Sequence, residues 1–156
     1  MPFHCCSLSL VLTHALLLPP FSSLPPTRFE APGPSNWRSI AGPAAFADLL
    51  STTSPSTLIV AEYFVPWCPG CRTLQPKLHA IAAANPDAVF VTINGGGDPA
   101  LAAWVEGRGV TRLPWFELIR GGRVVTALAA NLSAVARLRA EIAAAKCCEG
   151  ECAEKR

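Results

Sequence analysis

The sequence predicts an α/β domain in which a central mixed β-sheet carries helices on both faces. Short apolar runs alternate with segments whose apolar residues recur every three or four positions, which is the spacing of one helix face. The run 58–65 is apolar almost throughout, as is typical of a strand buried on both sides. Gly121 and Gly122 separate two further apolar runs and indicate a β-hairpin, since such a turn requires positive φ.

In chain order the expected elements form the series β-α-β-α-β-α-β-β-α. Strands are predicted at residues 36–40, 58–65, 88–94, 115–120 and 123–128, the first as a brief edge strand. Helices are predicted at 43–50, 68–84 and 98–106, followed by a last helix beyond residue 131. Three glycines at 95–97 indicate a flexible turn after the third strand.

Local signals support these helices. Pro43 stands at a helix-opening position, and Asp98 is suited to cap the third helix. Pro76 lies inside the second helix and should kink it, because proline removes a helix hydrogen bond. Asn131 or Ser133 is expected to cap the last helix. Its apolar stripe is predicted to consist of Leu132, Val135, Leu138 and Ile142.

The 156 residues divide into an N-terminal segment at 1–35, one domain at 36–146 and a cysteine-rich tail at 147–156. The first segment has no acidic residue before Glu30 and a single Arg, and its apolar stretch 8–18 is too short to span a bilayer. We interpret it as an organelle transit peptide. A secretory signal and a disordered or mis-started N-terminus are the alternatives. All three interpretations place residues 1–35 outside the folded domain.

Composition excludes several function classes. The net charge is +2 and charged residues make up 15%, so we expect no nucleic-acid binding, and we expect no membrane span. The seven cysteines occur at positions 5, 6, 68, 71, 147, 148 and 152. Only the central pair lies inside the predicted domain, whereas a disulfide-stapled scaffold distributes its cysteines through the fold. This uneven placement favours chemically active thiols over structural disulfides.

The segment Trp67-Cys-Pro-Gly-Cys71 follows the buried strand and begins the second helix. A dithiol at this position indicates reversible thiol–disulfide chemistry, because the positive end of a helix stabilises a thiolate. Cys68 is expected at the helix terminus, with Cys71 one turn on. A structural disulfide and half of a zinc site are the alternatives. Zinc would need two more ligands, and the domain has no second Cys-x-x-Cys or His pair.

Four features, in order along residues 36–146, resemble the thioredoxin family: the Trp-Cys-x-x-Cys segment, Pro76 five residues past Cys71, the pair Leu113-Pro114 and the Gly-Gly hairpin turn. The segments 64–78 and 85–94, and more loosely 108–116, are similar to atypical chloroplast thioredoxins of plants and algae. The resemblance implies the thioredoxin fold and a protein-disulfide reductase without a cofactor. It also implies a chloroplast location, in the stroma or at the thylakoid.

The same resemblance assigns roles to individual residues. Cys68 is the expected nucleophile and Cys71 the resolving thiol, while Pro114 is the expected cis-proline. Trp67 and Leu113 join Pro114 in an apolar groove for the substrate. The partners it implies are disulfide-bearing target proteins and an upstream electron-donor reductase or a peroxiredoxin-type acceptor. We expect a monomer.

Two positions depart from the family pattern. Pro69-Gly70 stands between the cysteines where most thioredoxins have Gly-Pro. The family's buried acid corresponds to Glu62 rather than Asp, and we expect it to have a raised pKa and to exchange a proton with Cys71. The accompanying Lys corresponds to Thr92, which should leave Glu62 more often protonated.

Other polar residues receive less specific interpretations. Arg112 is expected to be a solvated charge, with stabilisation of the Cys68 thiolate or steering of acidic targets as the alternative. His79 is expected to pack or face solvent rather than bind metal. The tail thiols Cys147, Cys148 and Cys152 are open to four interpretations: a loop-closing or intermolecular disulfide, exchange with the dithiol, metal binding, and no role.

Two other functions stay open from the sequence. The first is a disulfide oxidase or isomerase of a secretory compartment, which requires that the N-terminal segment be a signal peptide. The second is a redox-silent binding module or metal carrier that uses the fold as a scaffold and the tail thiols as ligands.

Overall fold

The computed structural model describes residues 33–147, which form a five-stranded sheet in the order β1-β3-β2-β4-β5. The strands are β1 (Trp37–Ile40), β2 (Ile59–Phe64), β3 (Val89–Asn94), β4 (Trp115–Arg120) and β5 (Arg123–Ala129). β1, β3 and β2 run parallel, and β4 and β5 are antiparallel to their neighbours. The predicted mixed sheet is therefore confirmed, and β1 is the expected short edge strand.

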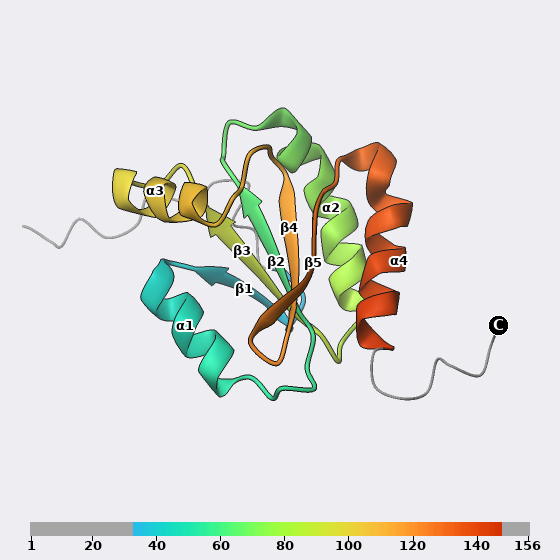
Figure 1. Ribbon diagram of the computed structural model, residues 1–156. Coiled ribbons are helices and arrows are strands. Elements are labelled where there is room, and N and C mark those ends of the chain that lie inside the picture. The colour runs from blue at the N-terminus through green and yellow to red at the C-terminus, as the bar shows by residue number, and fades with distance from the viewer. Residues whose placement is uncertain (1–32, 148–156) are drawn as a thin grey trace, which may run out of the picture.

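The helices cover both faces of this sheet (Figure 1). They are α1 (Pro43–Thr52), α2 (Pro69–Ala83), α3 (Pro99–Gly107) and α4 (Val135–Lys146), with a 3₁₀ turn, η1 (Leu132–Ala134), before α4. α2 and α4 lie on one face, and α1 and α3 lie on the other. No helix in the described range 33–147 is long and apolar enough to cross a membrane.

β2 occupies the middle of the sheet and all six of its residues are buried. Its side chains alternate between two cores because successive residues of a strand point to opposite faces. Val60 packs in the core under α2 and α4, whereas Ala61 and Tyr63 pack in the core under α1 and α3. This arrangement explains the nearly continuous apolar run in the sequence, and it brings the carboxyl end of β2 to the start of α2.

Most predicted helix signals are confirmed, but the signal for the last helix is wrong. Pro43 begins α1, and Asp98 Oδ1 accepts the backbone N–H of Leu101 at 2.8 Å. Neither Asn131 nor Ser133 caps α4, because η1 precedes it and Ala134 is its N-cap. Ser133 Oγ instead lies 2.6 Å from Asn131 Oδ1.

The predicted stripe of the last helix is also only partly correct. Leu138 and Ile142 are buried under the sheet, and Val135 packs at the edge of the same core. Leu132 belongs to η1 and is 47% exposed. The 3₁₀ turn changes the angular spacing of the side chains, so a residue placed by α-helical periodicity falls off the buried face.

The β4–β5 hairpin confirms the turn expected at Gly121 and Gly122, whose φ angles are 54° and 73°. Only glycine takes these angles readily, because a Cβ atom would clash with the backbone. α2 continues through Pro76 as one helix from Pro69 to Ala83.

A buried polar network that the sequence analysis did not identify lies on the α1/α3 face. Glu117 of β4 is buried, and its Oε2 accepts hydrogen bonds from Tyr63 Oη at 2.7 Å and from Arg108 Nη2 at 2.5 Å. The Arg108 guanidinium lies 5.0 Å from the ring centroid of Phe46 and 5.7 Å from that of Trp104. Since Arg108 directly follows α3, the network attaches the segment that leads to Pro114 to the centre of the sheet.

Glu117→Ala should lower the free energy of unfolding by about 3–5 kcal/mol, because it leaves the Arg108 charge in an apolar aromatic environment without its partner. Tyr63→Phe removes one hydrogen bond and should cost only about 1 kcal/mol. Urea denaturation of the two variants and the parent chain measures both. Equal losses in the two variants would show that the buried Glu117–Arg108 ion pair is not the main contribution of Glu117 to stability.

Candidate functional site

The two cysteines of the motif meet at the start of α2, directly beyond the end of β2. Cys68 is the N-cap of the helix and is half-buried, whereas Cys71 is fully buried. Their sulfur atoms are paired, the Cα atoms lie 5.4 Å apart, and the Cys71 backbone N–H points to Cys68 Sγ with an N-to-S distance of 3.2 Å. Cys68 is thus the more accessible sulfur, and it lies where unpaired helix N–H groups favour a thiolate.

Pro114 lies against the dithiol, although 46 positions separate it from Cys68 in the chain. The Leu113–Pro114 peptide bond is cis, which confirms the expected cis-proline, and Pro114 is buried. A Cβ atom added to Gly70 would lie 3.7 Å from Pro114 Cδ and 3.9 Å from Cys68 Sγ. Both the proline ring and the sulfur therefore lie close to Gly70. Leu113 packs against the cluster that Cys71 forms with Phe64.

Trp67 is 66% exposed and lies over the glycine turn that follows β3. A Cβ atom at Gly96 would come within 2.7 Å of Trp67 Cζ3, so the indole occupies the space that any other residue's side chain would need. The three glycines were predicted to form a flexible turn. The structure shows that the middle one has a steric role, because it leaves room for the exposed Trp67 ring.

Glu62 is buried in β2, with 2% of its surface exposed. Both carboxylate oxygens lack a hydrogen-bond partner within residues 33–147, and burial raises the pKa of Glu62 from 4.5 to about 8. Since its neighbours Ala61 and Tyr63 face α1 and α3, Glu62 faces the side that α2 covers. The predicted rise in pKa is confirmed, and its cause is desolvation without compensation.

Thr92 of β3 is the register partner of Glu62, as the sequence comparison with the family pattern implied. Its Oγ1 donates to the backbone oxygen of Arg38 at 3.5 Å rather than to the carboxyl group. No cation therefore lies beside Glu62 on β3, which is consistent with its raised pKa.

The remaining candidates lie elsewhere. His79 is half-buried with its ring edge-on to Trp37 at 4.6 Å between centroids, and burial lowers the pKa of His79. Arg112 is exposed. Cys147 is an exposed free thiol, while Cys148 and Cys152 lie outside the described residues, as do residues 1–32 of the N-terminal segment. Within 33–147 no group of three His, Cys, Asp or Glu side chains is arranged to hold a metal ion.

Cys147 lies at the opposite end of α2 from the dithiol. The preceding residue, Lys146, donates to Asn85 Oδ1 at 2.8 Å and to Asp87 Oδ1 at 2.6 Å, just past the C-terminus of α2. α2 has 15 residues and is about 22 Å long.

Gly96→Ala should displace the Trp67 indole, because the added Cβ overlaps the ring. Gly97→Ala is the matched control: its Cβ would meet only ordinary contacts, with Asn94 O at 3.6 Å and Leu101 Cδ2 at 3.7 Å. The indole N–H signal of Trp67, assigned by its loss in Trp67→Phe, should shift in the first variant and stay in place in the second. An unmoved signal in Gly96→Ala would contradict this packing.

The buried Glu62 should make stability depend on pH. Between pH 4.5 and about 8 the unfolded chain loses the proton that folded Glu62 retains, so the free energy of unfolding falls as pH rises. The slope should approach about 1.4 kcal/mol per pH unit. Glu62→Gln should remove this contribution to the slope.

Urea unfolding of the oxidised parent and Glu62→Gln chains from pH 5 to 8.5 measures this contribution as the difference between two curves. All other ionisable groups are common to the two chains, so their contributions cancel in the difference. A difference that does not change with pH would show that Glu62 is ionised across the range.

The chain is similar in sequence to known proteins. The thioredoxin family model matches residues 40–144. "Thioredoxin-like 1-1, chloroplastic" of Arabidopsis thaliana is 35% identical over 91 residues, covering 57% of this chain and 32% of that protein. The chain thus spans about a third of the length of this curated relative.

Solved structures show the same architecture. Fasciola hepatica thioredoxin has a TM-score of 0.63 and 27% identity, covering 70% of this chain and 99% of that one. A structure described as the complex of ferredoxin:thioredoxin reductase and thioredoxin f2 matches with a TM-score of 0.63 and 17% identity, covering 71% of this chain and 96% of the matching one. The central mixed sheet with helices on both faces is the thioredoxin fold, and the chain belongs to the thioredoxin family.

Proposed function

We propose that the protein is a thiol–disulfide oxidoreductase that exchanges disulfides with partner proteins and acts as a protein-disulfide reductase. The observation that carries this proposal is the asymmetry of the dithiol. Cys68 is accessible at a helix N-terminus, and Cys71 is fully buried behind it. One sulfur can meet a large substrate while the other can meet only its neighbour.

In the reducing direction, the Cys68 thiolate attacks one sulfur of a target disulfide. A mixed disulfide forms and the first target thiolate leaves. The Cys71 thiolate then attacks Cys68 Sγ, which restores the Cys68–Cys71 disulfide and releases the second target thiolate. The target takes up two electrons and two protons, and the protein dithiol is oxidised by two electrons.

Glu62 is proposed to accept the proton of Cys71 in the second step. Its pKa of about 8 lies close to the ordinary thiol value of about 8.5, so transfer between the two groups is nearly balanced. The carboxyl group faces the helix that carries Cys71, and it has no other hydrogen-bond partner among the described residues.

Trp67, Leu113 and Pro114 are proposed to form the surface on which the target chain lies. The exposed indole and Leu113 supply apolar contact beside the cysteines. An extended target segment would pass over the Gly70–Pro114 contact, where it is within reach of Cys68.

The attacking and resolving roles are tested by trapping. Cys71→Ser should accumulate covalent adducts between Cys68 and target proteins, because the second step is lost, whereas Cys68→Ser should accumulate none. Non-reducing electrophoresis followed by mass spectrometry detects the adducts. Equal adduct formation in both variants would assign the reaction to other thiols, and a Cys147/Cys148/Cys152→Ser background identifies the contribution of the tail.

The direction of exchange and the electron donor are part of the proposal. The name of the curated relative and the fold shared with thioredoxin f2 support a chloroplast protein that an upstream reductase reduces. A midpoint potential near about −270 mV fits a reductase, whereas one near about −180 mV fits an oxidase or isomerase. The destination of a fluorescent fusion of residues 1–40 tests the location.

A further inference from the structure

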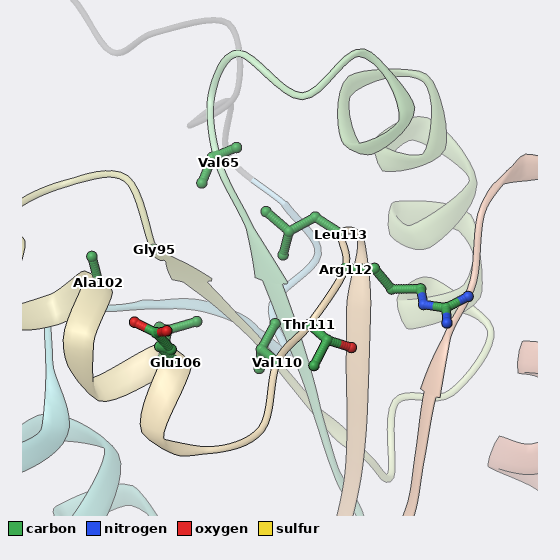
Figure 2. Close-up of a pocket in the computed structure, with 9 residues that line it drawn as sticks. Val65, Gly95, Ala102, Glu106, Val110, Thr111, Arg112 and Leu113 are labelled. Atoms are coloured by element: carbon green, nitrogen blue, oxygen red, sulfur yellow. The ribbon is translucent and has the colours of Figure 1, made fainter.

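A pocket of about 650 Å³ lies next to the dithiol, between α3 and the segment that leads to Pro114 (Figure 2). Its walls are mostly apolar and come from four parts of the fold: the residue after β2, the turn after β3, helix α3 and the loop before β4. They include Val65, Gly95, Ala102, Val105, Val110 and Leu113. Its volume is within the range of pockets that enclose ligand groups.

The pocket adjoins the reacting sulfur through a shared wall. Leu113 lines it and also packs against the cluster of Phe64 and Cys71, against which Cys68 packs as well. Figure 2 shows the Leu113 side chain directed toward Val65, which comes three residues before Cys68. A peptide whose cysteine reaches Cys68 can therefore place a nearby side chain in the pocket.

The missing side chain of Gly95 helps to keep the pocket open. A Cβ atom there would lie 3.4 Å from Val105 Cγ1 and 3.7 Å from the backbone oxygen of Phe64, so a larger residue would occupy space beside the α3 wall. Gly95 has no left-handed φ that would require glycine, so its role here is to leave room.

The mouth of the pocket carries one unneutralised negative charge. Glu106 lies on α3 at the rim and forms no ion pair within residues 33–147. Arg112 extends away from Glu106, on the other side of the loop (Figure 2). A basic group on an occupant would therefore meet a free carboxylate at the rim.

We propose that this pocket selects targets by the residues that flank their disulfide. It takes one bulky apolar side chain within three positions of the attacked cysteine, and Glu106 favours a neighbouring Lys or Arg. The inference rests on the proposed oxidoreductase function and adds a rule for its substrates.

The test uses ten-residue peptides in which a single cysteine carries a methyl disulfide, because methanethiol is too small to compete for the pocket. Phe is placed at each of the three positions on either side of the cysteine, in an otherwise Gly/Ser background, and the basal substrate has Ser throughout. The pre-reduced full-length chain is mixed with each peptide. Acid quenching and mass spectrometry give the rate, after subtraction of the rate of Cys68→Ser.

At one or more positions, Phe should raise the rate over Ser about tenfold, the order of discrimination that an apolar pocket provides. Ala102→Phe fills the pocket from the α3 wall and should remove this preference. Ala103→Phe adds the same side chain at an exposed position of α3 outside the lining and should retain it. Equal preference in the two variants, or no preference in the parent chain, would overturn the proposal.

The charge component is tested with the fastest Phe peptide, made with Lys or Glu beside the Phe. The parent chain should prefer Lys a few-fold at low salt, Glu106→Gln should lose the preference, and Glu106→Lys should reverse it. An unchanged preference in Glu106→Lys would show that Glu106 does not contribute to substrate selection.

Failure of this proposal differs from failure of the function. If the Ser peptide reacts no faster with the parent chain than with Cys68→Ser, the oxidoreductase function is wrong. If it reacts faster but shows no selectivity, only the pocket proposal is wrong.

Discussion

The burial of β2 on both faces is the constraint on which the rest of the structure depends. As the central strand, β2 hydrogen-bonds to β3 on one side and β4 on the other, and all of its side chains are buried. The direction of β2 determines where the chain leaves the sheet, and α2 begins at Pro69, five residues after the end of β2. Cys68 therefore lies in the short connection between a fully buried strand and the helix that it caps.

The two faces of β2 accommodate charge in opposite ways. On the α1/α3 side, Tyr63 hydrogen-bonds to Glu117, which is paired with Arg108 inside an aromatic enclosure. On the α2/α4 side, Glu62 has no partner within the described part of the chain, and its pKa rises to about 8. Burial of a lone carboxyl group costs stability whenever it is ionised, whereas a satisfied network retains its charge. The uncompensated acid lies on the face covered by α2, the helix that carries Cys71, as the proposed proton transfer requires.

Three segments that are remote in sequence converge around Cys68. The Gly70 contact brings in Pro114, the Gly96 contact seats Trp67 over the turn after β3, and Arg108 attaches the intervening loop to the sheet. At Gly96 the contact requires the absence of a side chain, because a Cβ atom there would overlap the indole. The proposed surface for an extended polypeptide and the adjoining pocket both result from this convergence, so the proposed substrate preference and the proposed reactivity have a common structural origin.

The sequence by itself determined the elements and their order, because hydrophobic periodicity, proline and glycine act within a few residues of where they stand. It also determined the identity of the dithiol and, through the family pattern, the location of the cis-proline and the buried acid. It misplaced the start of α4, because a single 3₁₀ turn leaves no local signal that distinguishes it from a first helical turn.

Only the tertiary structure decided which groups are paired and which are open to solvent. Three features depend on residues from different parts of the fold: the Glu117–Arg108 ion pair, the packing of Trp67 against Gly96 and the open space beside Gly95. The distance and burial of such groups depend on how strands and helices pack, and periodicity along one element carries no information about the element it faces. The proposed chemistry can therefore be predicted from the motif, whereas the proposed selectivity depends on how the strands and helices pack.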